Sequence, residues 1–175
     1  MSLSSKRKFC KMDELINRKN IYNSTFEISI RVLVLLKIIE KEYLSIDELM
    51  IYDYLTLNSY DVGGPASLHA PVPNRGVQVF SKKNLIKESI SFLLSKELVV
   101  INNNENGIFY AINNNGMLLL EYFESDYYKK LLFKIRWVNS EFGMTSRKEL
   151  DQFVKSNISE WGAEFMAQDN FNNRV

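Results

Sequence analysis

All three prolines of this 175-residue chain, two of its seven glycines and its single histidine fall within residues 61–73. A proline fixes its own φ, lacks an amide donor and pushes the residue before it toward extended geometry. This segment therefore cannot form a regular helix or a central strand. Long structureless connections are uncommon in compact domains, and Val62, Leu68 and Val72 can anchor this one. The sequence predicts an ordered, irregular loop.

The composition is that of one ordinary folded domain. Hydrophobic residues make up 46% of the chain and charged residues 25%, which argues against disorder. The length suffices for one substantial core but is short for two. The longest apolar stretch, residues 32–39, is interrupted by Lys37 and is far too short to span a bilayer. The net charge of +1 excludes a globally basic nucleic-acid-binding protein.

Charge is concentrated at the amino terminus, where residues 1–20 hold six lysines and arginines against two acidic residues. This segment lacks the apolar centre of a secretory signal, and the single cysteine, Cys10, cannot form an internal disulfide. We therefore expect a cytoplasmic protein with no membrane association. A phosphate-binding arm and a solvated terminus are both compatible with the basic segment.

Helical patterns dominate the first half of the chain. A capping-box pattern at residues 24–27 predicts a largely buried helix to about residue 41, and a second pattern at residues 45–48 predicts a helix through about residue 56. After the loop, Ser81 is predicted to cap a third helix with a clean apolar stripe.

The second half begins with a hairpin. Residues 98–101 are predicted to form a strand, residues 102–107 a turn and residues 108–112 the returning strand. The remainder is predicted to be helical, with one helix over residues 117–124 and a longer one that Ser125 caps and that ends at Gly143, before a restart at residues 145–149.

Three helices followed by a hairpin are the element order of a winged-helix domain. The predicted fold class is therefore mainly α with a small β-hairpin, arranged as a winged-helix-like three-helix core plus a C-terminal helical extension. The predicted units are a basic N-terminal arm (1–20), a winged-helix-like domain (21–112) with a long Gly/Pro loop (58–80), a C-terminal helical extension (113–168) and a polar tail (169–175).

The loop and its approach also resemble a known family. The residues that carry the resemblance are Asp53-Tyr54-Leu55, the run from Asn58 to Pro65 and Ser67-Leu68-His69, with further matches at residues 26–28, 31–33, 107–110, 137–138 and 161–165. Over about residues 22–165 the chain is similar to the small middle component of bacterial ABC-three-component systems, a group that includes Lamassu anti-phage defence. The Asp-Val-Gly-Gly-Pro block at residues 61–65 is the most specific part.

The resemblance implies a non-catalytic adaptor in an antiviral or anti-plasmid defence complex. Such an adaptor joins an SMC- or Rad50-like ATPase to an effector subunit, commonly a nuclease. The residues themselves support an adaptor, because the chain has a large core and an ordered loop beside tyrosines, which suit interfaces. The candidate interface residues are Asp53, Tyr54, Tyr60, Asp61, Gly63, Gly64, Pro65, Leu68 and His69.

Catalytic residues, metal ligands and cofactors are not expected. One histidine and one cysteine do not supply a catalytic triad or a zinc site. The Gly63-Gly64-Pro65 run lacks the lysine and hydroxyl residue that follow in a phosphate-binding loop. Asp61 and His69 could form an ion pair with each other, but we favour hydrogen bonds to the loop backbone as the explanation of both residues.

Basic residues near the third helix form a second candidate surface. Arg75, Lys82, Lys83 and Lys87 are predicted DNA-phosphate contacts, of the kind that a recognition helix makes. The alternative is a solvated helix face, because no cluster of arginine, asparagine or glutamine offers bidentate base readout. The alternative function is a stand-alone winged-helix DNA-binding transcriptional regulator.

Overall fold

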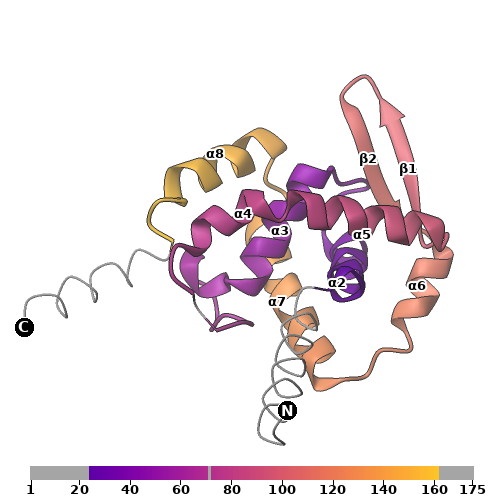
Figure 1. The fold of residues 1–175 in the computed structure, drawn as a ribbon, viewed down its shortest axis with the longest axis horizontal. Coiled ribbons are helices and arrows are strands. Elements are labelled where there is room, and N and C mark those ends of the chain that lie inside the picture. The colour runs from indigo at the N-terminus through magenta and orange to yellow at the C-terminus, as the bar shows by residue number, and fades with distance from the viewer. Residues whose placement is uncertain (1–23, 71, 162–175) are drawn as a thin grey trace, which may run out of the picture.

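The computed structural model describes residues 24–70 and 72–161 (Figure 1). The predicted fold class, mainly α with a small β-hairpin, is confirmed. The basic arm at residues 1–20 and the tail at residues 169–175 lie outside the described residues. In chain order the helices and strands are α2 (Thr25–Ile38), α3 (Ile46–Leu57), the 3₁₀ turns Ser59–Val62 and Arg75–Val77, α4 (Gln78–Ser81), α5 (Lys83–Ser95), β1 (Val99–Asn104), β2 (Gly107–Ile112), α6 (Asn114–Leu120), α7 (Asp126–Phe142) and α8 (Arg147–Asn157).

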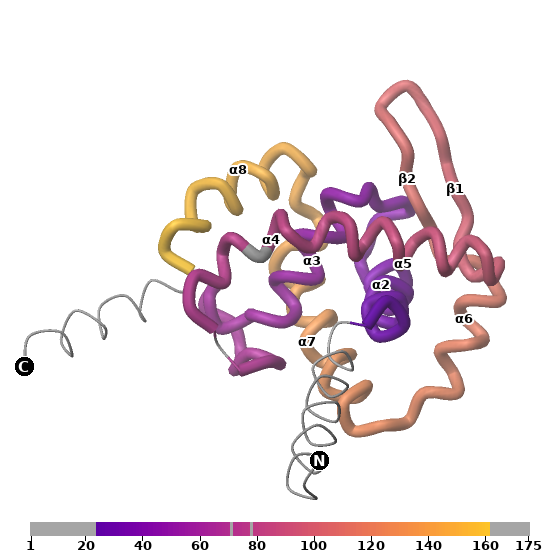
Figure 2. The backbone as a smooth tube through the Cα atoms, in the orientation of Figure 1, coloured from indigo at the N-terminus to yellow at the C-terminus, as the bar shows by residue number. Residues whose placement is uncertain are grey.

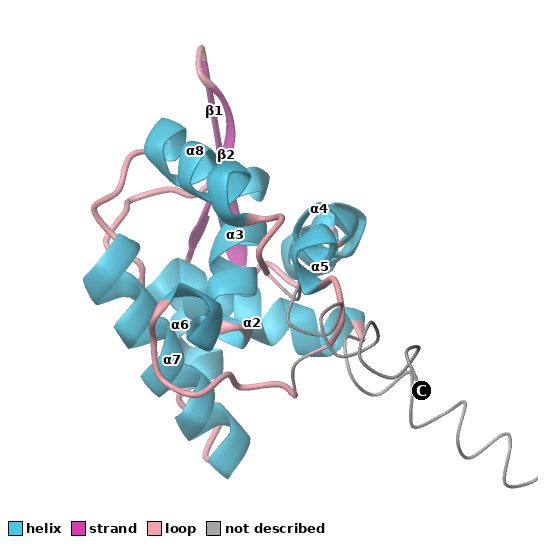
Figure 3. Cartoon of the chain, turned by 90° about the vertical axis from the view of Figure 1, so that its left-hand side faces the viewer, coloured by secondary structure: helices cyan, strands magenta, loops and turns pink. Residues whose placement is uncertain are grey.

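The core is built around α2. Every residue from Ile28 to Leu36 is buried, because α5, α3 and α7 pack along this helix and β2 and α6 also contact it (Figure 3). A helix that is apolar on nearly all sides belongs in such a position. The prediction of a largely buried first helix is confirmed.

The two predicted capping patterns both mark helix starts. At α3 the box is complete, since Ser45 Oγ accepts a hydrogen bond from the Glu48 amide at 3.3 Å and the Glu48 carboxylate accepts one from the Ser45 amide at 3.0 Å. At α2, Ser24 Oγ accepts from the Glu27 amide at 3.2 Å. The Glu27 carboxylate, however, accepts from the buried guanidinium of Arg31 at 2.8 Å, which is a strong, charge-assisted contact.

Two helices begin elsewhere than predicted. Ser81 is the last residue of α4, so its backbone is already helical and it does not cap α5, which follows Lys82 without a side-chain cap. The helix expected from residue 117 begins at Asn114, because Asn113 Oδ1 accepts a hydrogen bond from the Gly116 amide at 3.0 Å. An asparagine cap thus starts α6 one turn early.

The hairpin projects beyond the helices (Figure 2). Its strands pair from Val99 with Ile112 to Asn104 with Gly107, so the turn is much shorter than the predicted 102–107. The asparagines join β1 because a strand ladder uses backbone groups, which every residue but proline supplies. Leu44, between α2 and α3, bonds to Tyr110 of β2 through both backbone groups, at 2.8 and 2.9 Å. The winged-helix interpretation of this order stays a prediction.

The last two helices complete the same core. Ser125 caps α7 as predicted, accepting from the Tyr128 amide at 3.2 Å, and α7 packs against α2 and α3. A capping box between Ser146 and Glu149 starts α8, which packs against α3. None of the described helices combines the length and the apolar character of a membrane span.

Candidate interaction site at the proline loop

The proline loop leaves α3 through turns that need glycine. After the 3₁₀ turn Ser59–Val62, Gly63 adopts a left-handed φ of 76°, which favours glycine. Gly64 then passes the indole ring of Trp137 on α7 so closely that a Cβ atom would collide with the ring. This part of the loop therefore follows a path set by the body of its own domain.

Asp61 and Arg75 close the loop. The guanidinium donates to both carboxylate oxygens, from Nε to Oδ2 at 2.8 Å and from Nη2 to Oδ1 at 2.5 Å, and the Tyr54 hydroxyl donates to Oδ2 at 2.7 Å. Both charged side chains are buried, with 6% and 2% of their surface exposed. The partner of Asp61 is thus Arg75, not His69. Arg75 is committed to this pair and lacks the exposed position that a phosphate contact needs.

Tyr54 and the segment that follows α8 hold the far side of the loop. The Tyr54 ring stacks on Trp161, with centroids 4.7 Å apart, and the Trp161 carbonyl accepts a hydrogen bond from the Gly76 amide at 3.1 Å. A Cβ atom on Gly76 would collide with the Ile158 carbonyl. The loop is therefore clamped between α3, α7 and the segment that follows α8.

A second group of polar side chains lies where α2, α3 and α7 meet, with a buried centre and a more exposed edge. Arg31 and Asp53 are each 1% exposed, and they share hydrogen bonds from Nε to Oδ1 at 2.6 Å and from Nη2 to Oδ2 at 3.3 Å. Glu27 accepts from the Tyr127 hydroxyl at 3.0 Å. From the loop, His69 Nε2 lies 3.4 Å from the same hydroxyl. This polar network, with its buried Arg31–Asp53 pair, connects the loop to the centre of the core.

Opposing effects set the charges in the network. Burial alone would raise the pKa of Asp53, but the positive charges of Arg31 and Lys82 outweigh it and hold that pKa below its ordinary value. Burial lowers the pKa of the His69 imidazole, and the Arg31 charge adds to this effect, so both favour the neutral form of His69. Burial also raises the pKa of Tyr127 to about 12. The network combines ion-paired side chains with the imidazole of His69 and the hydroxyl of Tyr127, and buried polar groups in native proteins are usually satisfied in this way.

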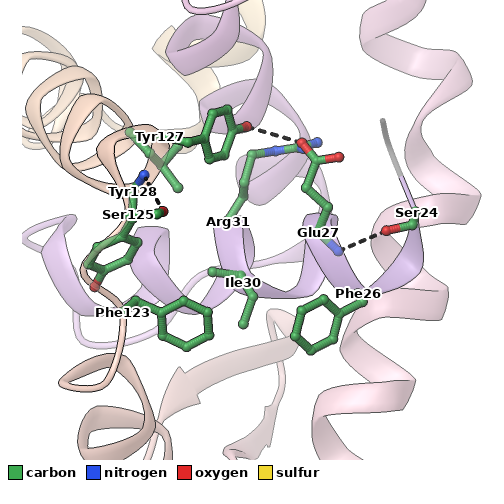
Figure 4. Close-up of a pocket in the computed structure, with 10 residues that line it drawn as sticks. Ser24, Phe26, Glu27, Ile30, Arg31, Phe123, Ser125, Tyr127 and Tyr128 are labelled. Carbon is green, nitrogen blue, oxygen red and sulfur yellow. Dashed lines mark hydrogen bonds and ion pairs between the residues drawn. The ribbon is translucent and has the colours of Figure 1, made fainter. Parts of the chain in front are cut away.

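A pocket of about 330 Å³ opens beside this network (Figure 4). Arg31, Glu27 and Tyr127 form its polar edge, with Glu27 and Tyr127 joined by a hydrogen bond. The rest of the lining is mostly apolar, which suits a hydrophobic group. Its other lining residues are Ser24, Phe26, Ile30, Phe123, Ser125, Tyr128 and Leu131.

The structure arranges the candidate interface residues in two layers. Asp53, Tyr54 and the Asp61 side chain form a buried inner layer. Tyr60, which is 71% exposed, stands on the outer layer. The other outer residues are exposed or half-buried; they are Gly63, Gly64, Pro65, Leu68 and His69. Only the outer layer is accessible to a partner.

The other predicted phosphate contacts lie in different environments. The Lys82 side chain is 12% exposed, and its Nζ is 3.6 Å from Asp53 Oδ2. Lys83 is 44% exposed and pairs with Asp47 at 2.6 Å. Lys87 lies exposed on α5. Lys83 and Lys87 are therefore the two residues of this set that the surface presents.

Asp53 and His69 are among the candidate residues that the sequence indicates, but Arg31, the buried partner of Asp53, is not. Arg31 is flanked by Ile30 and Val32 in a mostly apolar stretch, residues 28–36, and a charge in such a stretch requires a buried counter-charge. That signal points to a partner but does not say which residue it is. Among the residues described, no group of three or more histidine, cysteine, aspartate or glutamate side chains is placed to hold a metal ion.

These features define a small, mainly helical protein whose surface loop is clamped onto its own core. The chain belongs to the family ABC-three component (ABC-3C) system Middle Component 2, whose model matches residues 21–164. The resemblance noted in the sequence is thus confirmed at the level of the family. Comparison with curated proteins and with solved structures found no match. A middle component is one part of a system of several components, so this protein has partner subunits.

Proposed function

We propose that this protein is a non-catalytic adaptor in an antiviral or anti-plasmid defence complex of the Lamassu type. In this role it links an SMC- or Rad50-like ATPase to an effector nuclease in the cytoplasm. The observation that carries the proposal is the family match over residues 21–164, which makes the chain a middle component. ATP hydrolysis and nucleic-acid cleavage are then the work of the partners.

The clamped loop supports an adaptor role. A surface that is ordered before binding loses less conformational entropy when a partner docks. This loop is held in place by contacts inside its own chain, which are the buried Asp61–Arg75 pair and the contact between Gly64 and Trp137. Tyr60 stays exposed on its outer layer. Tyrosine is a frequent anchor of protein interfaces.

The adaptor role predicts a dependence of the complex on this chain. When the components are co-expressed and purified through a tag on the ATPase, the nuclease should co-purify, and omission of this chain should remove it. Size-exclusion chromatography and intact mass of the subunits provide the readout. If ATPase and nuclease remain together at the same yield without this chain, the adaptor proposal is wrong.

A stand-alone DNA-binding regulator is the second candidate, favoured by the order of the elements and by one strand contact. The order α2, α3, α5 and hairpin matches that of winged-helix domains, and the Leu44–Tyr110 bridge adds a short strand contact at the hairpin edge. Against it, Arg75 and Lys82 are occupied by internal carboxylates. Tight, salt-sensitive binding of one duplex sequence by the chain alone would favour the regulator.

DNA contact within the assembly leads to a separate prediction. Replacing Lys83 and Lys87 by alanine should weaken DNA binding by the complex and reduce the slope of log affinity against log salt by about 2, since each phosphate contact contributes roughly 0.9. Fluorescence anisotropy over a salt series measures both. The matched control removes two exposed charges elsewhere, at Lys37 and Arg136. An unchanged slope would assign Lys83 and Lys87 to a solvated helix face.

A further inference from the structure

Lys134 on α7 is a buried cation with no counter-charge in the part of the chain that the structure describes. The residue is 8% exposed, and its Nζ donates to the Ala66 carbonyl of the loop. Within residues 24–70 and 72–161 no carboxylate lies within ion-pair distance of it. By contrast, the other buried charged residues in this part of the chain each have an opposite charge at 3.0 Å or less; they are Arg31, Glu48, Asp53 and Arg75.

An unpaired buried ammonium is unfavourable, because it loses hydration without gaining an ionic partner. Burial accordingly lowers the pKa of Lys134. An ammonium also has three donors, and the Ala66 carbonyl is the one hydrogen-bond acceptor that Nζ meets among the described residues. Nζ also lies 5.5 Å from the centroid of the Phe133 ring, but this contact supplies no full negative charge. Among the described residues the ammonium thus has unused donors and no carboxylate partner, and both conditions favour an incoming carboxylate.

Lys134 lines a groove of about 530 Å³ between the loop and α7. We call it the loop–α7 groove; its residues are Ala66, Ser67, Leu68, Lys129, Lys130, Phe133 and Lys134. Phe133 is 59% exposed there. The ion pair nearest to the groove joins Lys129 to Asp126 at 3.8 Å, between side chains that are 67% and 94% exposed, and such a pair contributes little. The groove thus combines apolar surface with an excess of positive charge.

We propose that the loop–α7 groove docks an acidic segment of a partner subunit. One carboxylate of that segment pairs with Lys134 and Lys130, and an apolar side chain next to it packs on Phe133 and Leu68. Charge complementarity identifies the occupant, because an excess of lysine selects an acidic chain and steers its approach. A protein segment fits better than nucleic acid, because the groove has no arginine and a single exposed aromatic ring. This inference rests on the proposed adaptor function.

The substitution Lys134→Met tests the groove, since it removes the charge and keeps most of the side-chain length. The melting temperature of the full-length chain alone should stay the same or rise, because an unpaired buried charge is lost. The affinity for the complex of the other co-expressed subunits should fall about tenfold or more, as expected when one member of a buried charge pair is removed. Lys37→Met, on the exposed side of α2, is the matched control and should change neither value.

Carbodiimide cross-linking of the intact complex identifies the contact directly, since it joins a lysine amine to a neighbouring carboxylate without a spacer. Mass spectrometry should find Lys134 or Lys130 linked to an aspartate or glutamate of another subunit. Cross-links confined to lysines elsewhere, or unchanged affinity in Lys134→Met, would overturn the inference. Loss of DNA binding with intact assembly in Lys134→Met would assign the groove to nucleic acid. In each of these outcomes the chain still joins the ATPase to the nuclease, so the adaptor function would survive. Failure of the groove proposal can therefore be distinguished from failure of the adaptor proposal.

Discussion

Replacing Asp53 by alanine should lower the free energy of unfolding by about 3–5 kcal/mol, as expected when one member of a buried ion pair is removed. The substitution leaves the Arg31 guanidinium 1% exposed without the carboxylate that it contacts at 2.6 Å. Lys82 loses its partner at 3.6 Å as well. Urea unfolding followed by circular dichroism measures the change.

The matched control for Asp53→Ala removes an aspartate from an exposed pair. Asp151 contacts Lys155 at 2.6 Å, but the two side chains are 46% and 65% exposed. Asp151→Ala should therefore change the unfolding free energy by less than about 1 kcal/mol. A third variant, Arg31→Met with Asp53→Leu, replaces both charges by apolar groups and should recover part of the loss. Equal small losses in Asp53→Ala and Asp151→Ala would contradict the buried pair.

The same residues predict a loss of stability in acid. The folded-state pKa of Asp53 lies below its ordinary 3.8, so its contribution is present above that value and is lost as the pH falls through the folded pKa. The folded-state pKa of His69 lies below its ordinary 6.5, so the unfolded chain binds its proton first. The unfolding free energy should therefore begin to fall as the pH drops below about 6.5. His69→Gln should remove this first part of the decline in urea titrations.

The elements of the fold were predictable where local chemistry decides them. Ser45 and Ser125 cap helices as predicted, because a cap depends on groups within a few residues. Ser81 was not predictable in this way, because α4 continues up to it and makes its backbone helical. The asparagines of β1 favour a turn by residue type, but they extend the strand because their backbone groups pair with β2. These errors arise where a neighbouring element, α4 for Ser81 and β2 for the asparagines, overrides the tendency of the single residue.

The candidate site was predictable only in part, since its contacts join distant residues. The prolines and glycines indicate a loop of fixed path, but they do not reveal that Asp61 pairs with Arg75 or that Arg31 pairs with Asp53 across 22 residues. Lys134 was also invisible in the sequence, because one lysine on a helix resembles any other. Its burial becomes apparent only when Ala66 of the loop lies against α7.

Gly64→Ala should destabilise the isolated chain by about 1–3 kcal/mol, the usual effect of inserting a methyl group into a filled space. Its Cβ atom would overlap the six-membered ring of Trp137, so the loop or the indole has to move. Chemical denaturation of the full-length chain measures the loss. Gly63→Ala is the matched control, because no atom lies within 4 Å of its added Cβ and only the φ of 76° opposes it.

A double-mutant cycle separates the clash from other effects of the Gly64 substitution. Trp137→Leu provides room for the added methyl group, so Gly64→Ala should be less destabilising in that background than in the native chain, with a coupling of about 1 kcal/mol or more between the two positions. Independent effects of the two substitutions would contradict the contact.

The same variants also show whether the loop takes part in assembly. If Gly64→Ala lowers stability while the complex forms with native affinity, the clamped loop serves its own domain; if affinity falls further than stability explains, its outer layer is part of the interface.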